Sequence, residues 1–188
     1  DQHGLTFGSL WDTTAWIEKC NSEGKRVVGH AVTVPTDYQF QLIDFNLFDS
    51  DPDWRAVTIG TLEDKIKNMS DPVLRIPLKE KYNPKHTFFG AMAVNIDKLR
   101  YGEGDNIDVH NKYEGRVIEE IAETENKHPI DVFLDISISE NLSSRWVTPP
   151  QEIDMEGMAR LANHPFSIPG LSDGGAHMKF LTAGIYPT

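Results

Sequence analysis

Apolar positions near the start of the chain first repeat with a helical period and then run almost without interruption. Over residues 12–24 this spacing predicts a helix with Trp16, Ile17 and Cys20 on one face. The following residues, 25–35, are rich in β-branched and apolar side chains, which is typical of a buried strand. A helix, a glycine and then a buried strand form the repeating unit of a parallel α/β sheet.

The same alternation returns in the C-terminal third. Helices are predicted at 117–126, from Pro129 onward and around 155–161. Pro165 ends the third of these helices, and the apolar residues at 167–172 predict a strand. Pro129 suits a first helical turn, where no amide hydrogen is needed, and its helix is expected to bury Ile130, Phe133, Leu134 and Ile136.

A short amphipathic helix is predicted over 61–69. Thr61 and Asp64 have the spacing of a capping box, with Asp as the weaker partner at the third position. The apolar face of this helix is expected to consist of Leu62, Ile66 and Met69.

Most of the remaining middle of the chain is expected to be loop. Residues 36–55 have no clear period, and their aromatic side chains favour a long loop that covers an active face. A strand is expected at 88–95, parallel to the strands at 26–34 and 167–172. The Gly-, Asp- and Asn-rich stretch 100–113 indicates a connection.

Composition and charge narrow the classes of protein and partner. The chain has 188 residues, of which 39% are hydrophobic and 25% charged, enough for one domain with a real core. A net charge of −11 argues against nucleic acid and anionic membranes as partners. The chain shows neither a membrane-length apolar run nor a signal-peptide pattern. Cys20, the single cysteine, excludes an intrachain disulfide and favours a cytoplasmic protein.

Candidate chemistry concentrates in residues 164–177. The predicted strand there delivers Asp173 onto Gly174 and Gly175, which let the backbone turn sharply, and His177 follows. An acid at the carboxyl end of a buried strand, followed by such a turn, is typical of α/β active sites. The alternative is an aspartate that caps a tight strand-to-helix turn.

Residues 170–177, Gly-Leu-Ser-Asp-Gly-Gly-Ala-His, resemble the strand-8 motif of the N-acyl-D-amino-acid deacylase (D-aminoacylase) branch of the metal-dependent amidohydrolases. The similarity extends upstream to 115–123, 127–131 and 162–165. The resemblance implies an α/β fold that corresponds to about the last three βα units, strands 6 to 8, of a (β/α)8 TIM barrel. The whole chain would then be one partial barrel domain, with long loops and insertions over 36–113 on the active face.

This family hydrolyses linear amides with zinc or another divalent metal, and the resemblance gives Asp173 the roles of catalytic acid/base and metal ligand. His30 is either a second metal ligand or a core histidine bonded to a backbone carbonyl. Arg75, in an Asp-Pro-x-x-Arg stretch similar to the family's, is either a ligand for the substrate carboxylate or a surface arginine. His177 is either a substrate-binding residue or a loop histidine.

The sequence also departs from the family. The His-x-His pair of the first barrel strand is absent from these 188 residues, and a catalytic zinc needs three or four ligands. We therefore expect a fragment that binds metal weakly, hydrolyses its small-molecule N-acyl amino acid substrate poorly, and self-associates through open barrel edges. Two alternatives are a non-catalytic acidic α/β module that binds a partner through 36–55, and an amidohydrolase that acts on cyclic amides.

Overall fold

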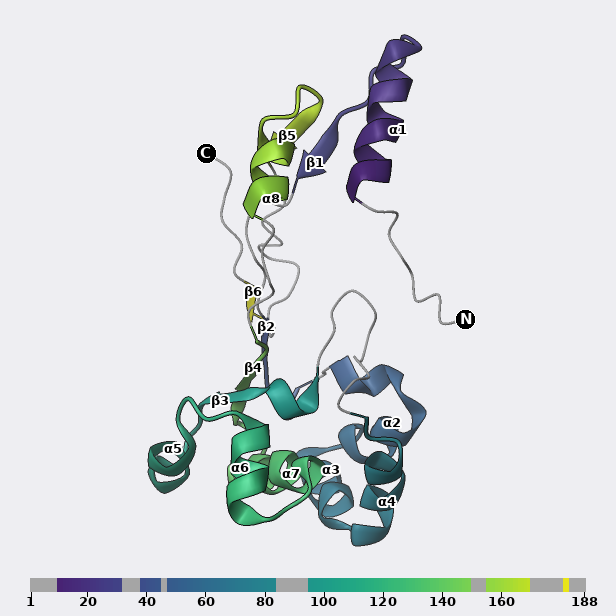
Figure 1. The fold of residues 1–188 in the computed structure, drawn as a ribbon. Coiled ribbons are helices and arrows are strands. Elements are labelled where there is room, and N and C mark those ends of the chain that lie inside the picture. The colour runs from purple at the N-terminus through teal and green to yellow at the C-terminus, as the bar shows by residue number, and fades with distance from the viewer. Residues whose placement is uncertain are drawn as a thin grey trace. The chain divides into compact units, whose positions relative to one another are not determined.

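The computed structural model describes residues 10–31, 38–44, 47–83, 95–149, 155–169 and 181–182. The chain divides into two compact units (Figure 1). The terminal unit combines both ends of the chain, residues 1–37, 150–178 and 182–188. The central unit consists of residues 38–149 and 179–181.

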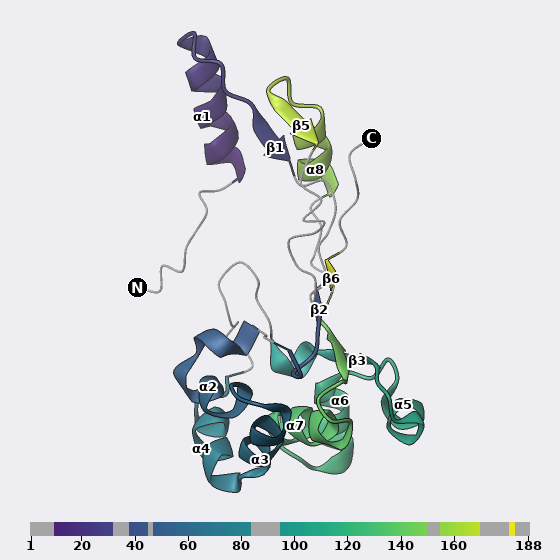
Figure 2. The same ribbon diagram turned by 180° about the vertical axis from the view of Figure 1, so that it is seen from behind.

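Two helices and two strands make up the described part of the terminal unit: α1 (Leu10–Ser22), β1 (Gly29–Ala31), α8 (Met155–Ala162) and β5 (Ser167–Pro169) (Figures 1 and 2). β1 and β5 pair in parallel, with Gly29 opposite Ser167 and His30 opposite Ile168. The predicted helices and the parallel relation of these two strands are confirmed, although each strand is only three residues long.

Gly29 explains how closely α1 packs against β1. A Cβ atom at this position would lie 2.8 Å from Cδ1 of Ile17, so a larger residue would push the helix side chain away. Ile17 and Cys20 are buried as predicted, whereas Trp16 is exposed. The turn between the two elements is held by Asn21, whose Nδ2 donates to the carbonyl oxygens of Ile17 and Val27 at 2.9 and 2.7 Å.

The direct pairing of β1 with β5 changes the expected strand order. Because the two strands are hydrogen-bonded neighbours, no third strand lies between them. The strand expected at 88–95 falls almost entirely outside the described residues, so its pairing stays a prediction. The central unit is therefore an insertion in the sequence between two adjacent parallel strands.

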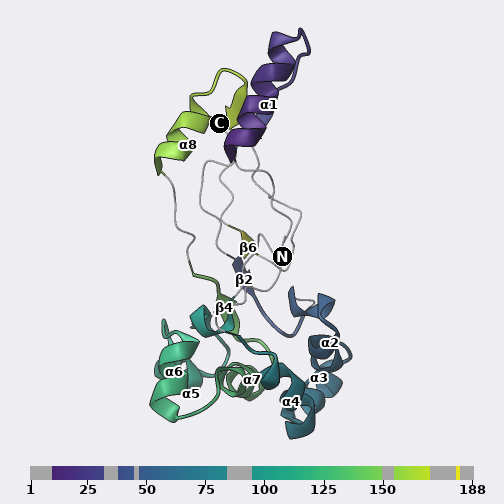
Figure 3. The ribbon, with the colours of Figure 1, turned by 45° about the vertical axis from the view of Figure 1, so that its right-hand side comes forward.

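Helix α7 (Pro129–Ser139) is the centre of the central unit. It packs against α6 (Ile118–Glu125) on one side and against α3 (Leu62–Ser70) and α4 (Pro72–Glu80) on the other (Figure 3). The apolar residues predicted to be buried on α7 are all in the core: Ile130, Phe133, Leu134 and Ile136. The capping box that opens α3 is present, with Thr61 and Asp64 bonded reciprocally.

A small sheet borders these helices. Its strands are β3 (Arg100–Glu103), β4 (Arg145–Val147), β2 (Tyr38–Phe40) and β6 (Leu181–Thr182), in that spatial order. β4 is antiparallel to both β2 and β3. The expectation that 100–113 is only a connection is wrong, because this stretch forms β3 and then α5 (Ile107–Tyr113), which Asn106 caps.

In its described residues, the aromatic segment 36–55 forms short elements that pack into the core, so the expectation of a long loop over the active face is wrong there. It contains β2, the short 3-10 helix η1 (Leu47–Ser50) and α2 (Pro52–Thr58). Phe40, Phe48 and Trp54 are buried and pack against Phe133 of α7, with ring centroids 5.6–6.5 Å from that ring. A strand, a 3-10 helix and an α-helix follow one another here, so the apolar positions of this segment share no single period.

The described residues thus form a mixed α/β structure that is mostly helical with small sheets, and they do not close into a barrel. Among the helices within this described part, none has the length and apolar composition that crossing a bilayer requires. A further short helical turn, η3 (Ile96–Lys98), precedes β3.

Candidate functional site

Two of the predicted site residues belong in the sequence to the β1–β5 pair: His30 lies in β1, and Asp173 follows β5. Because the strands are parallel, both end at the same edge, which is where α/β proteins build their sites. His30 is the central residue of β1. Asp173 follows β5 by four residues, but residues 170–180, which include Asp173 and His177, lie outside the described residues.

His30 is not a core histidine. Its side chain is exposed, so the alternative in which it is buried against a backbone carbonyl is wrong. An exposed imidazole on a strand, next to the strand that leads to Asp173, remains available as a ligand for a metal or a substrate.

The turn that leads into β5 carries a histidine whose importance the sequence did not reveal. His164 Nδ1 lies 3.3 Å from the backbone nitrogen of Phe166, and its Nε2 lies 3.0 Å from Oε1 of Glu18 on α1. The carbonyl oxygen of Phe166 accepts a hydrogen bond from Gly29 N–H at 2.9 Å. The start of β5 is therefore tied to both α1 and β1.

Arg75 belongs to the central unit, where it links α4 to α7. Its Nη1 donates to Asp131 at 2.9 Å and to Asp135 at 2.8 Å, and its Nε donates to the carbonyl oxygen of Met69 at 2.6 Å. The alternative of an exposed surface arginine is wrong, because its side chain is only 11% exposed. A substrate carboxylate would have to compete with two protein carboxylates for this guanidinium.

The electrostatics of Asp131 support this structural role. Burial alone would raise the pKa of the Asp131 carboxyl, but hydrogen bonds from Lys79 and Arg75 outweigh burial and lower the pKa. Lys79 Nζ lies 2.6 Å from Asp131 Oδ2. Asp131 is therefore held ionised between two cations of α4.

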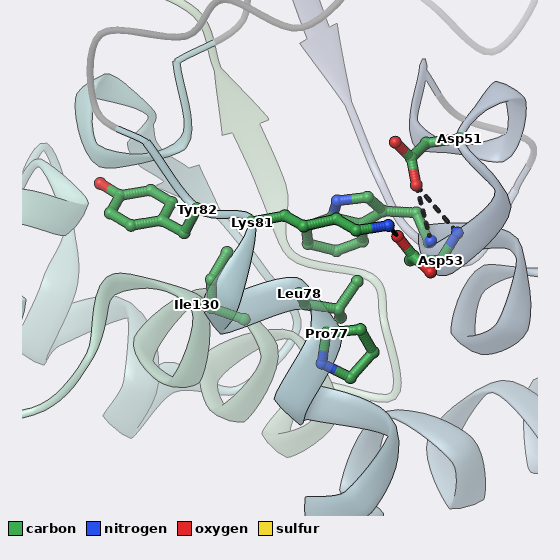
Figure 4. Close-up of a pocket in the computed structure, with 8 residues that line it drawn as sticks. Asp51, Asp53, Pro77, Leu78, Lys81, Tyr82 and Ile130 are labelled. Atoms are coloured by element: carbon green, nitrogen blue, oxygen red, sulfur yellow. Dashed lines mark hydrogen bonds and ion pairs between the residues drawn. The ribbon is translucent and has the colours of Figure 1, made fainter.

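A surface recess in the central unit is closed by its own side chains. Lys81 extends across it to an ion pair with Asp53 (Figure 4). Asp51 is occupied in capping α2, where it accepts hydrogen bonds from the N–H groups of Asp53 and Trp54 at 2.9 and 3.2 Å. Burial, followed by the charges of nearby acids, raises the pKa of Tyr82 to about 12, so its phenol stays protonated. The charged groups of Lys81, Asp53 and Asp51 are thus engaged within the protein itself, which favours a structural role for the recess (Figure 4).

Glu140, at the end of α7, forms a second buried polar cluster. Its carboxylate accepts hydrogen bonds from the Tyr101 hydroxyl at 3.0 Å, from Asn106 N–H at 3.2 Å and from the Ser144 hydroxyl. A Cβ atom on Gly104 would lie 2.1 Å from Glu140 Oε1, so only glycine lets the β3–α5 turn approach this closely. Burial and the bond to Glu140 raise the pKa of Tyr101. The cluster fastens β3, α5 and β4 to α7.

The described residues do not by themselves supply a metal centre. Within them, no three His, Cys, Asp or Glu side chains are grouped so that they could hold a metal ion. A zinc site needs three or four ligands, so His30 on its own is not sufficient. The pairing of His30 with Asp173 as ligands stays a prediction.

Comparisons of the chain with protein-family models, with curated proteins and with solved structures give no match. The resemblance of residues 170–177 to an amidohydrolase motif therefore rests on those residues themselves. The geometry that bears on it is the parallel pair that precedes the motif.

Proposed function

We propose that this chain is part of a metal-dependent hydrolase that cleaves linear, non-peptide C–N bonds, of the N-acyl-D-amino-acid deacylase type. The observation that carries the proposal is the direct parallel pairing of β1 with β5. It brings the strand with His30 beside the strand that leads to Asp173, at the edge where (β/α)8 enzymes place their sites. In this proposal β1 and β5 are neighbouring strands of a partial TIM barrel.

The proposed chemistry gives each residue a definite task. Amide hydrolysis at neutral pH needs an activated water and a polarised carbonyl, both of which a bound zinc or other divalent metal supplies. Asp173 takes a proton from the attacking water and delivers it to the leaving nitrogen. In this proposal His30 contributes an imidazole ligand, and His177 has the role of a substrate-binding residue. The proposal gives Arg75 a structural task instead of substrate binding, because its guanidinium is bound by Asp131 and Asp135.

The ligand count limits what the chain does alone. His30 and Asp173 are two candidate ligands, fewer than a catalytic zinc requires, so the proposal needs at least one further ligand besides these two. We propose that the isolated chain is inactive and that the enzyme acts in the cytoplasm, in keeping with its single cysteine.

The test uses the complete reading frame that encodes this chain, expressed with zinc and assayed on three substrate classes. N-acetyl-D-amino acids should be hydrolysed, and N-acetyl-L-amino acids and a cyclic amide should be hydrolysed much more slowly. Hydrolysis of the cyclic amide alone would favour the cyclic-amidohydrolase alternative. Hydrolysis of none of them would favour a binding module.

Asp173→Asn is the decisive variant. Asparagine keeps the shape of aspartate and is as good a turn cap, but it has no titratable proton. Loss of one positioned acid/base should lower kcat/KM by roughly 10² to 10⁴, with the melting temperature unchanged. Asp154→Asn, the same substitution at an acid with no proposed chemistry, is the matched control. Activity of Asp173→Asn within about threefold of wild type would leave Asp173 as a turn residue.

A further inference from the structure

His164 makes two side-chain hydrogen bonds in opposite directions at the entrance to β5. Nδ1 lies 3.3 Å from the backbone nitrogen of Phe166, and Nε2 lies 3.0 Å from Oε1 of Glu18. The side chain of His164 is 14% exposed, whereas that of Glu18 is 60% exposed. The first bond is local to the turn, and the second reaches α1.

These two partners fix the tautomer of the imidazole. The Phe166 backbone N–H is a donor, so Nδ1 must accept and carries no hydrogen. The ring hydrogen is therefore on Nε2, from which it donates to the Glu18 carboxylate. One neutral imidazole in the Nε2–H form satisfies both contacts.

Both backbone polar groups of Phe166 are therefore hydrogen-bonded. Its N–H is bonded to His164, and its carbonyl oxygen accepts from Gly29 N–H at 2.9 Å. The next residue, Ser167, donates from its N–H to the carbonyl oxygen of His164 at 3.0 Å and pairs with Gly29. A slip of one residue at this point would turn every later side chain of β5 to the opposite face of the sheet.

We propose that His164 is a positioning residue that sets the register of β5 on β1. By holding Phe166 while that residue binds Gly29, the imidazole determines which way the strand leading to Asp173 faces relative to His30. This inference extends the proposed hydrolase function, because the register matters for catalysis only if Asp173 and His30 act together. The hydrogen bonds that carry the inference lie wholly within described residues of the terminal unit.

Two amide variants separate the contacts of the imidazole. Asparagine presents its oxygen near the position of Nδ1, so His164→Asn keeps an acceptor for Phe166 N–H. Glutamine presents its amide near the position of Nε2, so His164→Gln keeps only a donor for Glu18. Because Glu18 is mostly exposed, its bond contributes little. His164→Asn should therefore resemble wild type, and His164→Gln should resemble His164→Ala.

The first measurement is NMR of the 188-residue chain, without metal or substrate. The ¹⁵N shifts of the His164 ring should show the Nε2–H tautomer. Amide exchange at Gly29 should quicken about fivefold to tenfold in His164→Gln, the effect of one lost hydrogen bond, and change less than about twofold in His164→Asn. An Nδ1–H tautomer, or equal exchange in the two variants, would overturn the proposal. If His164→Gln fails to fold, the wild-type tautomer and Gly29 exchange in His164→Asn decide the matter.

The second measurement is activity of the complete reading frame on an N-acetyl-D-amino acid. His164→Gln should lower kcat with little change in KM, and His164→Asn should restore kcat. A residue that only stabilises the fold would change the melting temperature and leave kcat per folded molecule unaltered, which would overturn the positioning role. If the wild type lacks deacylase activity, the proposed function fails, and the NMR result still decides whether His164 sets the register.

Discussion

Replacement of Arg75 by methionine should weaken the central unit, because its guanidinium joins α4 to α7. Nη1 donates to both Asp131 and Asp135, and Nε donates to the carbonyl oxygen of Met69. Methionine keeps much of the aliphatic stem but makes none of these bonds. The substitution therefore separates the ionic role of Arg75 from its packing.

The loss in the free energy of unfolding depends on how exposed the two aspartates are and on which cations they keep after the substitution. The side chain of Asp131 is 21% exposed and that of Asp135 is 41% exposed. The energy that each bond contributes therefore lies between that of a buried bond and that of a surface bond. Hydrogen bonds to charged groups contribute about 1.5–3 kcal/mol when buried and much less at the surface. Asp131 keeps Lys79 and Asp135 keeps Lys127 as cations. We expect a loss of about 2 kcal/mol in the free energy of unfolding, less than for a fully buried pair.

Urea unfolding followed by tryptophan fluorescence measures this loss, because Trp54 and Trp146 are buried in the central unit. Arg75→Lys is the matched control: it keeps the charge but not the planar fork, so its loss should be smaller. The difference between wild type and Arg75→Met should be present at neutral pH. It should fade as the pH falls below about 3.9, through the lowered pKa of Asp131, because a protonated carboxyl gains nothing from the guanidinium.

An Arg75→Met variant within about 0.5 kcal/mol of wild type would refute the structural assignment. If the same variant raised KM for an N-acyl amino acid without changing stability, Arg75 would return to the substrate site. A change in the urea m-value would indicate instead that the compactness of one state had changed.

Three further predictions concern other contacts. Gly29→Ala should destabilise the terminal unit by about 1 kcal/mol and lower its melting temperature, because the new Cβ meets Cδ1 of Ile17. Adding Ile17→Val to the same chain should recover part of this loss, and purely additive effects of the two substitutions would disprove the clash. Hydrogen bonds from Lys112 and Tyr113 lower the pKa of Glu125 to about 2, so its carboxylate should stabilise the fold above about pH 5 and lose this effect as the pH falls toward 2. A Glu125→Gln chain with the same acid-unfolding curve as wild type would contradict this prediction. Calorimetric titration of the 188-residue chain with zinc should show weak binding or none, and a site of nanomolar affinity would show that the ligands are present after all.

Elements with a strong period and a specific cap could be predicted from the sequence. α7 begins at Pro129 and buries the expected apolar face, and α3 begins with the capping box of Thr61 and Asp64. In each case local residues specify the element without help from distant contacts. The parallel relation of β1 and β5 could also be predicted, because helix–strand alternation favours it.

Elements that depend on distant partners could not be predicted. β3 and β4 are four and three residues long, and their pairing joins residues about 45 positions apart. Arg75 has an ordinary helical sequence context, and only the fold brings Asp131 and Asp135 to it. His164 was visible as part of a motif, but its role depends on the bond between Phe166 and Gly29, which are far apart in the sequence and which only the fold brings together.

The antiparallel pairing of β2 with β4 has a consequence for how the chain folds. Gln39 lies opposite Val147, so the two ends of the central unit meet once that unit has formed. Before this, pairing of Gly29 with Ser167 must close a very long loop, which is slow for such non-local contacts. Afterwards the length of chain that this pairing must still close is roughly four to five times shorter, which lowers the entropic cost of closure by on the order of 1 kcal/mol. We therefore expect the order of folding to be hierarchical: the middle of the chain forms first and brings the two ends within reach of each other.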